Sequence, residues 1–167
     1  MKKILALMMM LCLLCGVAMA EEQAEADVEN ELSGDYVVFD QLGLQIWLPE
    51  GLNAAEVSEE DAASGRLAAY VADDQSAYFT VDAINMGEMT IDQLYENVTN
   101  DANSTEVEVL DCNGLTVVSC RNNQTDCFTG ALVDTNSNII MFSMGPASSE
   151  GADAVFYYVM ASLQAAE

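Results

Sequence analysis

Residues 106–121 read EVEVLDCNGLTVVSCR, and this stretch decides the fold. Two runs of β-forming residues flank Asn113-Gly114, the strongest two-residue hairpin signal, because a type I′ turn needs positive φ at both central residues. The turn predicts three cross-strand pairs: Cys112 with Leu115, Val109 with Val118, and Glu106 with Arg121. The last pair places opposite charges across the hairpin, which favours this register.

Similar short runs of β-forming residues lie on both sides of the hairpin. The further predicted strands comprise residues 36–39, 44–48, 67–72, 78–84, 127–133 and 139–144. Residues 52–65 are small and polar, which predicts a loop with about one helical turn.

Two segments carry helical periodicity. Thr90 and Gln93 have the spacing of a capping box, and Met89 with Leu94 can form the hydrophobic staple across it. Apolar residues then recur at helical spacing up to Val98, and a second helix is predicted from about Ser149. Strands followed by helices that cover them indicate an α+β fold: a central antiparallel sheet of about six to seven strands flanked by two helices.

The first 20 residues have the layout of a secretory signal peptide. Lys2 and Lys3 precede an apolar run over 4–17, and small residues allow cleavage after Ala20. Residues 21–34 are acidic and contain no aromatic residue, which predicts a flexible linker. We therefore expect a signal peptide over 1–20, a linker over 21–34 and a single α+β domain over 35–167, located outside the cytoplasm.

The chain is strongly acidic, with 28 Asp and Glu against 4 Lys and Arg and no His. Cleavage after Ala20 would leave 28 negative charges against Arg66 and Arg121, a formal charge of −26. Such a surface repels nucleic acid and anionic lipid, so we expect neither as a partner, and no stable membrane anchor after cleavage. The acidic residues are best explained by a need for solubility, and the alternative is that they attract divalent cations weakly.

Three cysteines follow the leader, in a compartment that permits disulfides. If the next hairpin turns at Asn123-Gln124, Cys120 lies opposite Cys127, which predicts a Cys120–Cys127 bridge with Cys112 free. The alternative is three separate buried thiols. A catalytic thiol is not expected, because the chain has no histidine to deprotonate it.

No group of residues specifies a reaction, so we assign no catalytic, cofactor-binding or metal-ligating residue. Absence of histidine removes Ser-His-Asp catalysis and most zinc sites. Asp134, Asn136 and Asn138 alternate as in a calcium loop, but Ile139 stands where that loop needs glycine, so a plain β-turn is the preferred interpretation. Paired carboxylates could hydrolyse a glycoside, although no pair is singled out. The aromatic residues that could form either a ligand surface or the core are Trp47, Tyr70, Tyr78 and Phe79.

One further motif carries a resemblance to a known group of proteins. Residues 43–51 read GLQIWLPEG, a strand that ends in a Pro-Glu-Gly turn. With the helix over 91–98, the Asn113-Gly114 hairpin and the closing helix, this arrangement resembles the PsbP-like fold superfamily, including the DcrB-like group of small exported bacterial proteins. The resemblance implies a central antiparallel sheet and a non-enzymatic activity. It transfers no binding residue, because members bind different partners through different surfaces.

These observations predict an exported, non-enzymatic binding or accessory protein of the cell envelope or extracellular space. Its partner is a protein or envelope component that the sequence does not identify. Two alternatives stay open: a calcium-binding protein that uses its acidic surface, and a carboxylate-based hydrolase.

Overall fold

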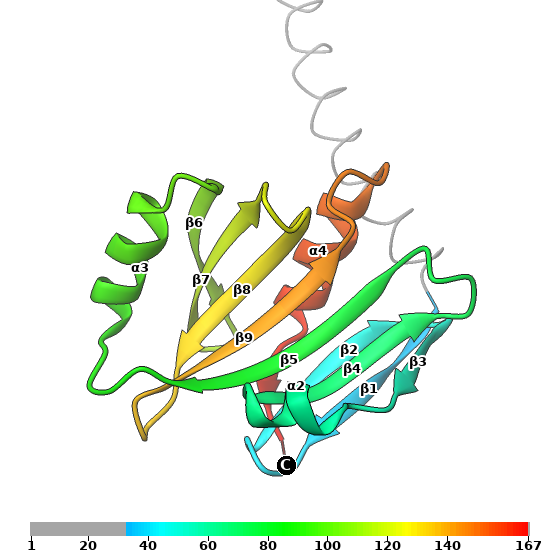
Figure 1. Ribbon diagram of the computed structural model, residues 1–167, viewed down its shortest axis with the longest axis horizontal. Helices are drawn as coiled ribbons and strands as arrows, with labels where there is room; N and C mark the ends of the chain where they lie inside the picture. The colour runs from blue at the N-terminus through cyan, green and yellow to red at the C-terminus, as the bar shows by residue number, and fades with distance from the viewer. Residues whose placement is uncertain (1–32, 167) are drawn as a thin grey trace, which may run out of the picture. The chain divides into compact units, whose positions relative to one another are not determined.

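The computed structural model describes residues 33–166, and a compact unit begins at Asp35 (Figure 1). In chain order its elements are β1 (Gly34–Phe39), β2 (Leu44–Pro49), β3 (Leu52–Ala55), α2 (Glu59–Ala63), β4 (Arg66–Ala72), β5 (Tyr78–Asn85), α3 (Ile91–Asn100), β6 (Ser104–Cys112), β7 (Leu115–Asn122), β8 (Cys127–Val133), β9 (Asn138–Gly145), α4 (Ala152–Ala161) and β10 (Gln164–Ala165). The predicted signal peptide, its cleavage site after Ala20 and nearly all of the predicted linker lie outside the described residues. No helix within residues 33–166 has the length and apolar content needed to cross a membrane.

Seven strands form one antiparallel sheet in the order β3-β4-β5-β9-β8-β7-β6, and β1, β2 and β10 form a second, small sheet. The α+β prediction is therefore confirmed. The five-residue helix α2 is the helical turn predicted within residues 52–65, whereas the sequence pattern did not indicate β3 and β10, which have 4 and 2 residues. Elements this short carry too few periods for a pattern to show.

The β6–β7 hairpin turns at Asn113-Gly114 as predicted, with Cys112 opposite Leu115 and Val109 opposite Val118. The predicted pairing of Glu106 with Arg121 is wrong. A bulge between Thr105 and Glu108 shifts the register, Glu106 takes φ +54°, and Arg121 lies opposite Thr105. A bulge adds one residue to one strand, so every pair beyond it moves by one position.

Asn113 also connects this turn to the last helix. Its side-chain Nδ2 donates to the carbonyl oxygen of Ala161 at 3.0 Å and to that of Leu163 at 2.9 Å. These carbonyls lie at the C-terminal end of α4, where helix hydrogen bonds run out. The turn residue therefore completes the hydrogen bonding of a helix almost fifty residues away in sequence.

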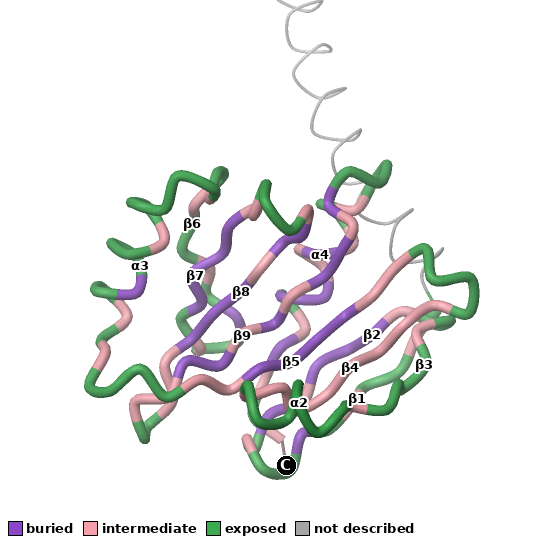
Figure 2. The backbone as a smooth tube through the Cα atoms, viewed as in Figure 1, coloured by how far each residue is buried: buried purple, intermediate pink, exposed green. Residues whose placement is uncertain are grey.

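One face of the seven-stranded sheet, the core face, carries Phe79, Val81, Phe128, Ile140 and Phe142, all buried (Figure 2). α4 packs between this face and β2. The ring of Phe156 stacks on Phe128 at 5.3 Å, and Tyr158 meets Trp47 edge to face at 4.9 Å. Among the aromatic residues considered from sequence, Trp47 and Phe79 are therefore core.

The opposite face, the groove face, is covered at one end by α3. This helix begins as predicted, with a capping box in which Thr90 Oγ1 accepts from Gln93 N–H and Gln93 Oε1 accepts from Thr90 N–H. Leu94 packs on Val118, Ala131 and Ile139 of the sheet. We call these three sheet positions the apolar half of the groove face.

Candidate binding groove

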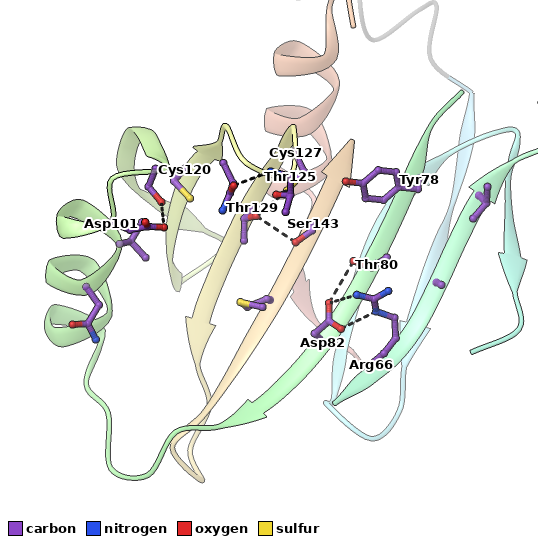
Figure 3. A pocket seen from close by; sticks show the side chains of 17 residues that line it. Arg66, Tyr78, Thr80, Asp82, Asp101, Cys120, Thr125, Cys127, Thr129 and Ser143 are labelled. Atoms are coloured by element: carbon purple, nitrogen blue, oxygen red, sulfur yellow. Dashed lines mark hydrogen bonds and ion pairs between the residues drawn. The ribbon is translucent and has the colours of Figure 1, made fainter. Parts of the chain in front are cut away.

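The uncovered part of the groove face forms a cavity of about 770 Å³ (Figure 3). Its floor is the sheet from β7 to β5, and its two walls are the C-terminal half of α3 and strand β4. The lining side chains are those of Arg66, Ala69, Val71, Tyr78, Thr80, Asp82, Asn97, Val98, Asp101, Ser104, Cys120, Asn122, Thr125, Cys127, Thr129, Met141 and Ser143. Its volume lies within the range of pockets for small molecules.

The chemistry of the groove face changes along each strand, because alternate residues of a strand point to the same face. On β9 the residues of this face are Ile139, Met141 and Ser143, and on β8 they are Ala131 and Thr129, so both strands change from apolar side chains to hydroxyl groups. On β5 the equivalent positions are Thr80 and Asp82. We call Thr80, Asp82, Thr129 and Ser143 the polar half of the groove face. It is the part that α3 leaves open.

An ion pair crosses the floor of the polar half. Arg66 Nε donates to Asp82 Oδ1 at 2.8 Å and Arg66 Nη2 donates to Asp82 Oδ2 at 3.4 Å, while Thr80 Oγ1 donates to Asp82 Oδ2 at 3.4 Å. The side chain of Asp82 is 12% exposed and that of Arg66 is 33% exposed. The hydrogen bond to Asp82 raises the pKa of Arg66, and partial burial acts in the opposite direction. Because the two charges neutralise each other, the floor of the groove carries no net charge at this position.

Backbone geometry sets this pair. Arg66 lies opposite Asp82 in the β4–β5 ladder, next to a bulge between Arg66 and Ala68. The preceding residue, Gly65, has φ +105°, and a Cβ there would lie 2.5 Å from the carbonyl oxygen of Ala83. Glycine is required for this close approach, because any side chain would force β4 away from β5.

Hydroxyl and thiol groups continue the polar floor toward β8 and β9. Thr129 Oγ1 and Ser143 Oγ share a hydrogen bond of 3.3 Å, and Cys127 Sγ lies 3.1 Å from Thr125 Oγ1. Tyr78 closes this end, and its ring lies over Gly145, where a Cβ would approach the ring carbon Cζ to 2.6 Å. Burial raises the pKa of the Tyr78 hydroxyl, with a smaller contribution from Cys127. The groove thus combines hydrogen-bonding groups with one partly exposed aromatic ring.

The predicted position of Cys120 opposite Cys127 is wrong. The turn contains four residues rather than two, because Asn122 Oδ1 accepts from the N–H groups of both Gln124 and Thr125, so Cys120 pairs with Thr129 and Cys127 with Asn122. Cys112, Cys120 and Cys127 are all buried free thiols, and the Cys120–Cys127 bridge is not formed. Burial raises the pKa of Cys120, opposed in part by a hydrogen bond with Ser104.

The calcium-like alternation at 134–138 forms a tight turn between β8 and β9. Asp134 Oδ1 accepts from the N–H groups of Asn136 and Asn138, each at 2.8 Å, and Asp134 Oδ2 accepts from Asn138 Nδ2 at 2.9 Å. Desolvation acts to raise the pKa of Asp134, but the hydrogen bonds from Asn138 and Asn136 together lower it. The turn thus accounts for these residues. Within residues 33–166 no three His, Cys, Asp or Glu side chains are grouped so that they could hold a metal ion.

Two carboxylates line the groove among the described residues, Asp82 on β5 and Asp101 after α3, and Figure 3 shows them on opposite sides. Asp82 is bound by Arg66. The carboxylate of Asp101 accepts from Ser104 Oγ at 3.2 Å and from the Asn103 N–H at 3.1 Å. Both are therefore engaged in structural hydrogen bonds.

Sequence reasoning missed the polar half as a site. Of the four aromatic residues that could form a ligand surface, Tyr78 alone lines the groove, and Tyr70, Phe79 and Trp47 do not. A signal was present: Tyr78, Thr80 and Asp82 carry polar groups at alternate positions, and the intervening Phe79 and Val81 are apolar. The partner of Asp82 could not be inferred, because the bulge beside Arg66 displaces the register.

Comparison of the chain with protein-family models and with curated proteins gives no match. Among solved structures, the chain is similar to the solution structure of cyanobacterial PsbP (CyanoP) from Synechocystis sp. PCC 6803. The TM-score is 0.59 and the sequence identity 16%, over 80% of this chain and 93% of that chain. At this identity the likeness concerns the fold, and the DcrB-like grouping stays a prediction. Strand order, helix placement and this likeness together show that the chain has the PsbP-like fold.

Proposed function

We propose that this protein is an exported, non-enzymatic binding or accessory protein of the cell envelope or extracellular space, and that the groove is its binding surface. One observation carries the proposal. The core face is covered by α4 and the apolar half by α3, whereas the polar half lies open in a cavity of about 770 Å³. A sheet face that is concave, polar and uncovered is suited to bind a partner.

The chemistry of the groove supports binding rather than catalysis. A general acid or base needs a titratable group free to exchange a proton with a substrate. Arg66 holds Asp82, Asn103 and Ser104 hold Asp101, and the chain has no histidine. A reactive cysteine needs a lowered pKa, whereas burial raises the pKa of Cys120.

The location outside the cytoplasm is supported by the leader-like residues 1–20 and by the acidic composition, with a net charge of −24 for the whole chain. The expected outcome is that the protein recovered from the extracytoplasmic fraction begins at Glu21. N-terminal sequencing checks this, and recovery of Met1 on the fractionated protein would contradict export.

Binding through the groove is tested by affinity capture from the native envelope fraction with two matched variants. Thr129→Phe fills the groove floor, and Thr116→Phe changes an exposed threonine outside the groove. We expect the wild type and Thr116→Phe to retain the same component and Thr129→Phe to lose it. Identical capture by all three proteins would show that the partner binds elsewhere, and no specific capture by any would contradict a binding function.

A further inference from the structure

We propose that the groove binds a neutral saccharide, which rests on the proposed function of the groove as the binding surface. Three properties of the groove support a neutral saccharide: its charge, its hydrogen-bonding groups and its apolar patches.

The Arg66–Asp82 ion pair disfavours a charged ligand of either sign at the floor of the groove. An anionic ligand would have to compete with Asp82 for Arg66, in a chain with 28 acidic and 4 basic residues. A cationic ligand would find the Asp82 carboxylate already neutralised by two N–H donors of Arg66. Separating either partner would leave the other charge buried and unpaired, which is costly. The ligand that leaves the pair intact is neutral.

The polar half requires a ligand that forms many hydrogen bonds. The hydroxyls of Thr129 and Ser143 are only partly buried, share one hydrogen bond, and can each both donate and accept. Two side-chain amides also line the cavity, that of Asn97 on α3 and that of Asn122 at the end of β7. A purely apolar ligand would remove these groups from water without replacing their hydrogen bonds.

The same cavity also presents apolar surface. The apolar side chains that line it are Ala69 and Val71 of β4, Val98 of α3 and Met141 of β9. Figure 3 shows the Tyr78 ring at one end. A sugar ring carries hydroxyls around its edge and C–H groups on its faces. It can therefore meet the polar floor with its edge and the apolar walls and aromatic ring with its faces.

The inference is tested by applying the purified protein to an array that carries neutral, acidic and amine-bearing glycans. Maltose and N,N′-diacetylchitobiose are then titrated into ¹⁵N-labelled protein as soluble neutral probes. We expect the array to retain the protein on neutral glycans, and the amide signals that shift to be those of groove residues such as Tyr78, Thr80, Thr129 and Ser143.

Three variants assign the binding to these side chains. Thr129→Val removes one hydroxyl at nearly constant shape, and we expect about 2- to 10-fold weaker binding to the retained neutral glycan. Arg66→Met exposes the charge of Asp82 to the ligand, and we expect neutral glycans to lose affinity while amine-bearing glycans gain it. Thr116→Val, outside the groove, is the control and should bind as the wild type does.

Three results would overturn the inference: retention on acidic glycans alone, retention on amine-bearing glycans alone, or retention on none. Equal binding by Thr129→Val and Thr116→Val would also overturn it, because the hydroxyl floor would then make no contact. None of these results affects the proposed function, which the envelope capture with Thr129→Phe decides separately.

Discussion

The two halves of the groove face share strands β8 and β9, yet one half is closed and the other open. Val118, Ala131 and Ile139 lie under Leu94 of α3, whereas residues two or four positions along the same strands, such as Thr129 and Ser143, line a cavity. Strand geometry treats both halves alike. What differs is side-chain chemistry, because only the apolar half offers α3 a surface to bury.

This difference separates stability from binding within one surface. Apolar burial under α3 stabilises the fold, since apolar area removed from water contributes about 25 cal/mol per Å². The polar half is kept open by the same physics, because covering its ion pair and hydroxyls with an apolar helix would leave them without partners. Substitutions in the two halves should therefore affect different measurements.

Leu94→Ala in the apolar half should destabilise the protein by about 2–5 kcal/mol, through lost burial and the cavity that remains. Its control is Tyr95→Ala, which changes an exposed side chain of the same helix and should cost no more than about 0.5 kcal/mol. Urea unfolding measures both. Equal losses would mean that α3 contributes little through its packing on the sheet.

Arg66→Met in the polar half should destabilise the protein by about 1–3 kcal/mol, because Asp82 keeps its charge and loses both of its N–H donors. Arg121→Met is a matched control, since Arg121 lies 5.7 Å from the centre of the Phe128 ring and should cost about 0.5–1 kcal/mol. The double variant Arg66→Met/Asp82→Leu should recover part of the loss. A loss no larger than that of Arg121→Met would show that the pair is not coupled to folding.

Asp134→Asn tests the turn that joins β8 and β9 beyond the apolar half. The folded-state pKa of Asp134 is lowered, so the ionised form stabilises the fold. This contribution is fully present above the unfolded pKa of about 3.9 and is lost as pH falls through the folded value. We expect a difference of less than about 1 kcal/mol from the wild type at pH 7, because solvent screens this turn, and a smaller difference at pH 3. Thermal melts from pH 7 to pH 3 measure it, and a difference that grows on acidification would contradict the assignment.

Thr129→Val should change the free energy of unfolding least, by about 0.5 kcal/mol or less, because the new side chain fills the same space in an open groove. The variant should nevertheless lose ligand. A large loss of stability would instead show that the shared hydrogen bond with Ser143 holds the sheet together.

The elements that sequence predicted well have local causes. Thr90 and Gln93 start α3 through bonds made within four residues, and Asn113-Gly114 fixes the register of β6 and β7 near the turn. The wrong cross-strand pairs arise where a bulge adds one residue to a strand or where a turn is longer than predicted. The bulge at Glu106 moved Arg121, and the four-residue turn after Asn122 moved Cys127. A period of two cannot reveal either displacement.

The groove was less predictable than the fold, because it depends on strands that meet across the sheet. Arg66 and Asp82 are 16 residues apart and face each other only because Gly65 lets β4 approach β5. Thr129 and Ser143 come from two further strands. The sequence shows that these residues are polar, but not that they lie together. They lie together because β5 pairs with β9 and not with β6, the next strand in the chain after α3.

Asn113 shows why two residues that are equivalent in an isolated hairpin need not be exchangeable in a protein. Aspartate would satisfy the turn as well as asparagine does. It has no N–H to donate, however, and its carboxylate would face the carbonyl oxygens of Ala161 and Leu163, a repulsive arrangement. Asparagine at position 113 is therefore required by its contacts with Ala161 and Leu163 as much as by the geometry of its own turn. The turn reaches its final hydrogen-bonded state only after the last helix has docked.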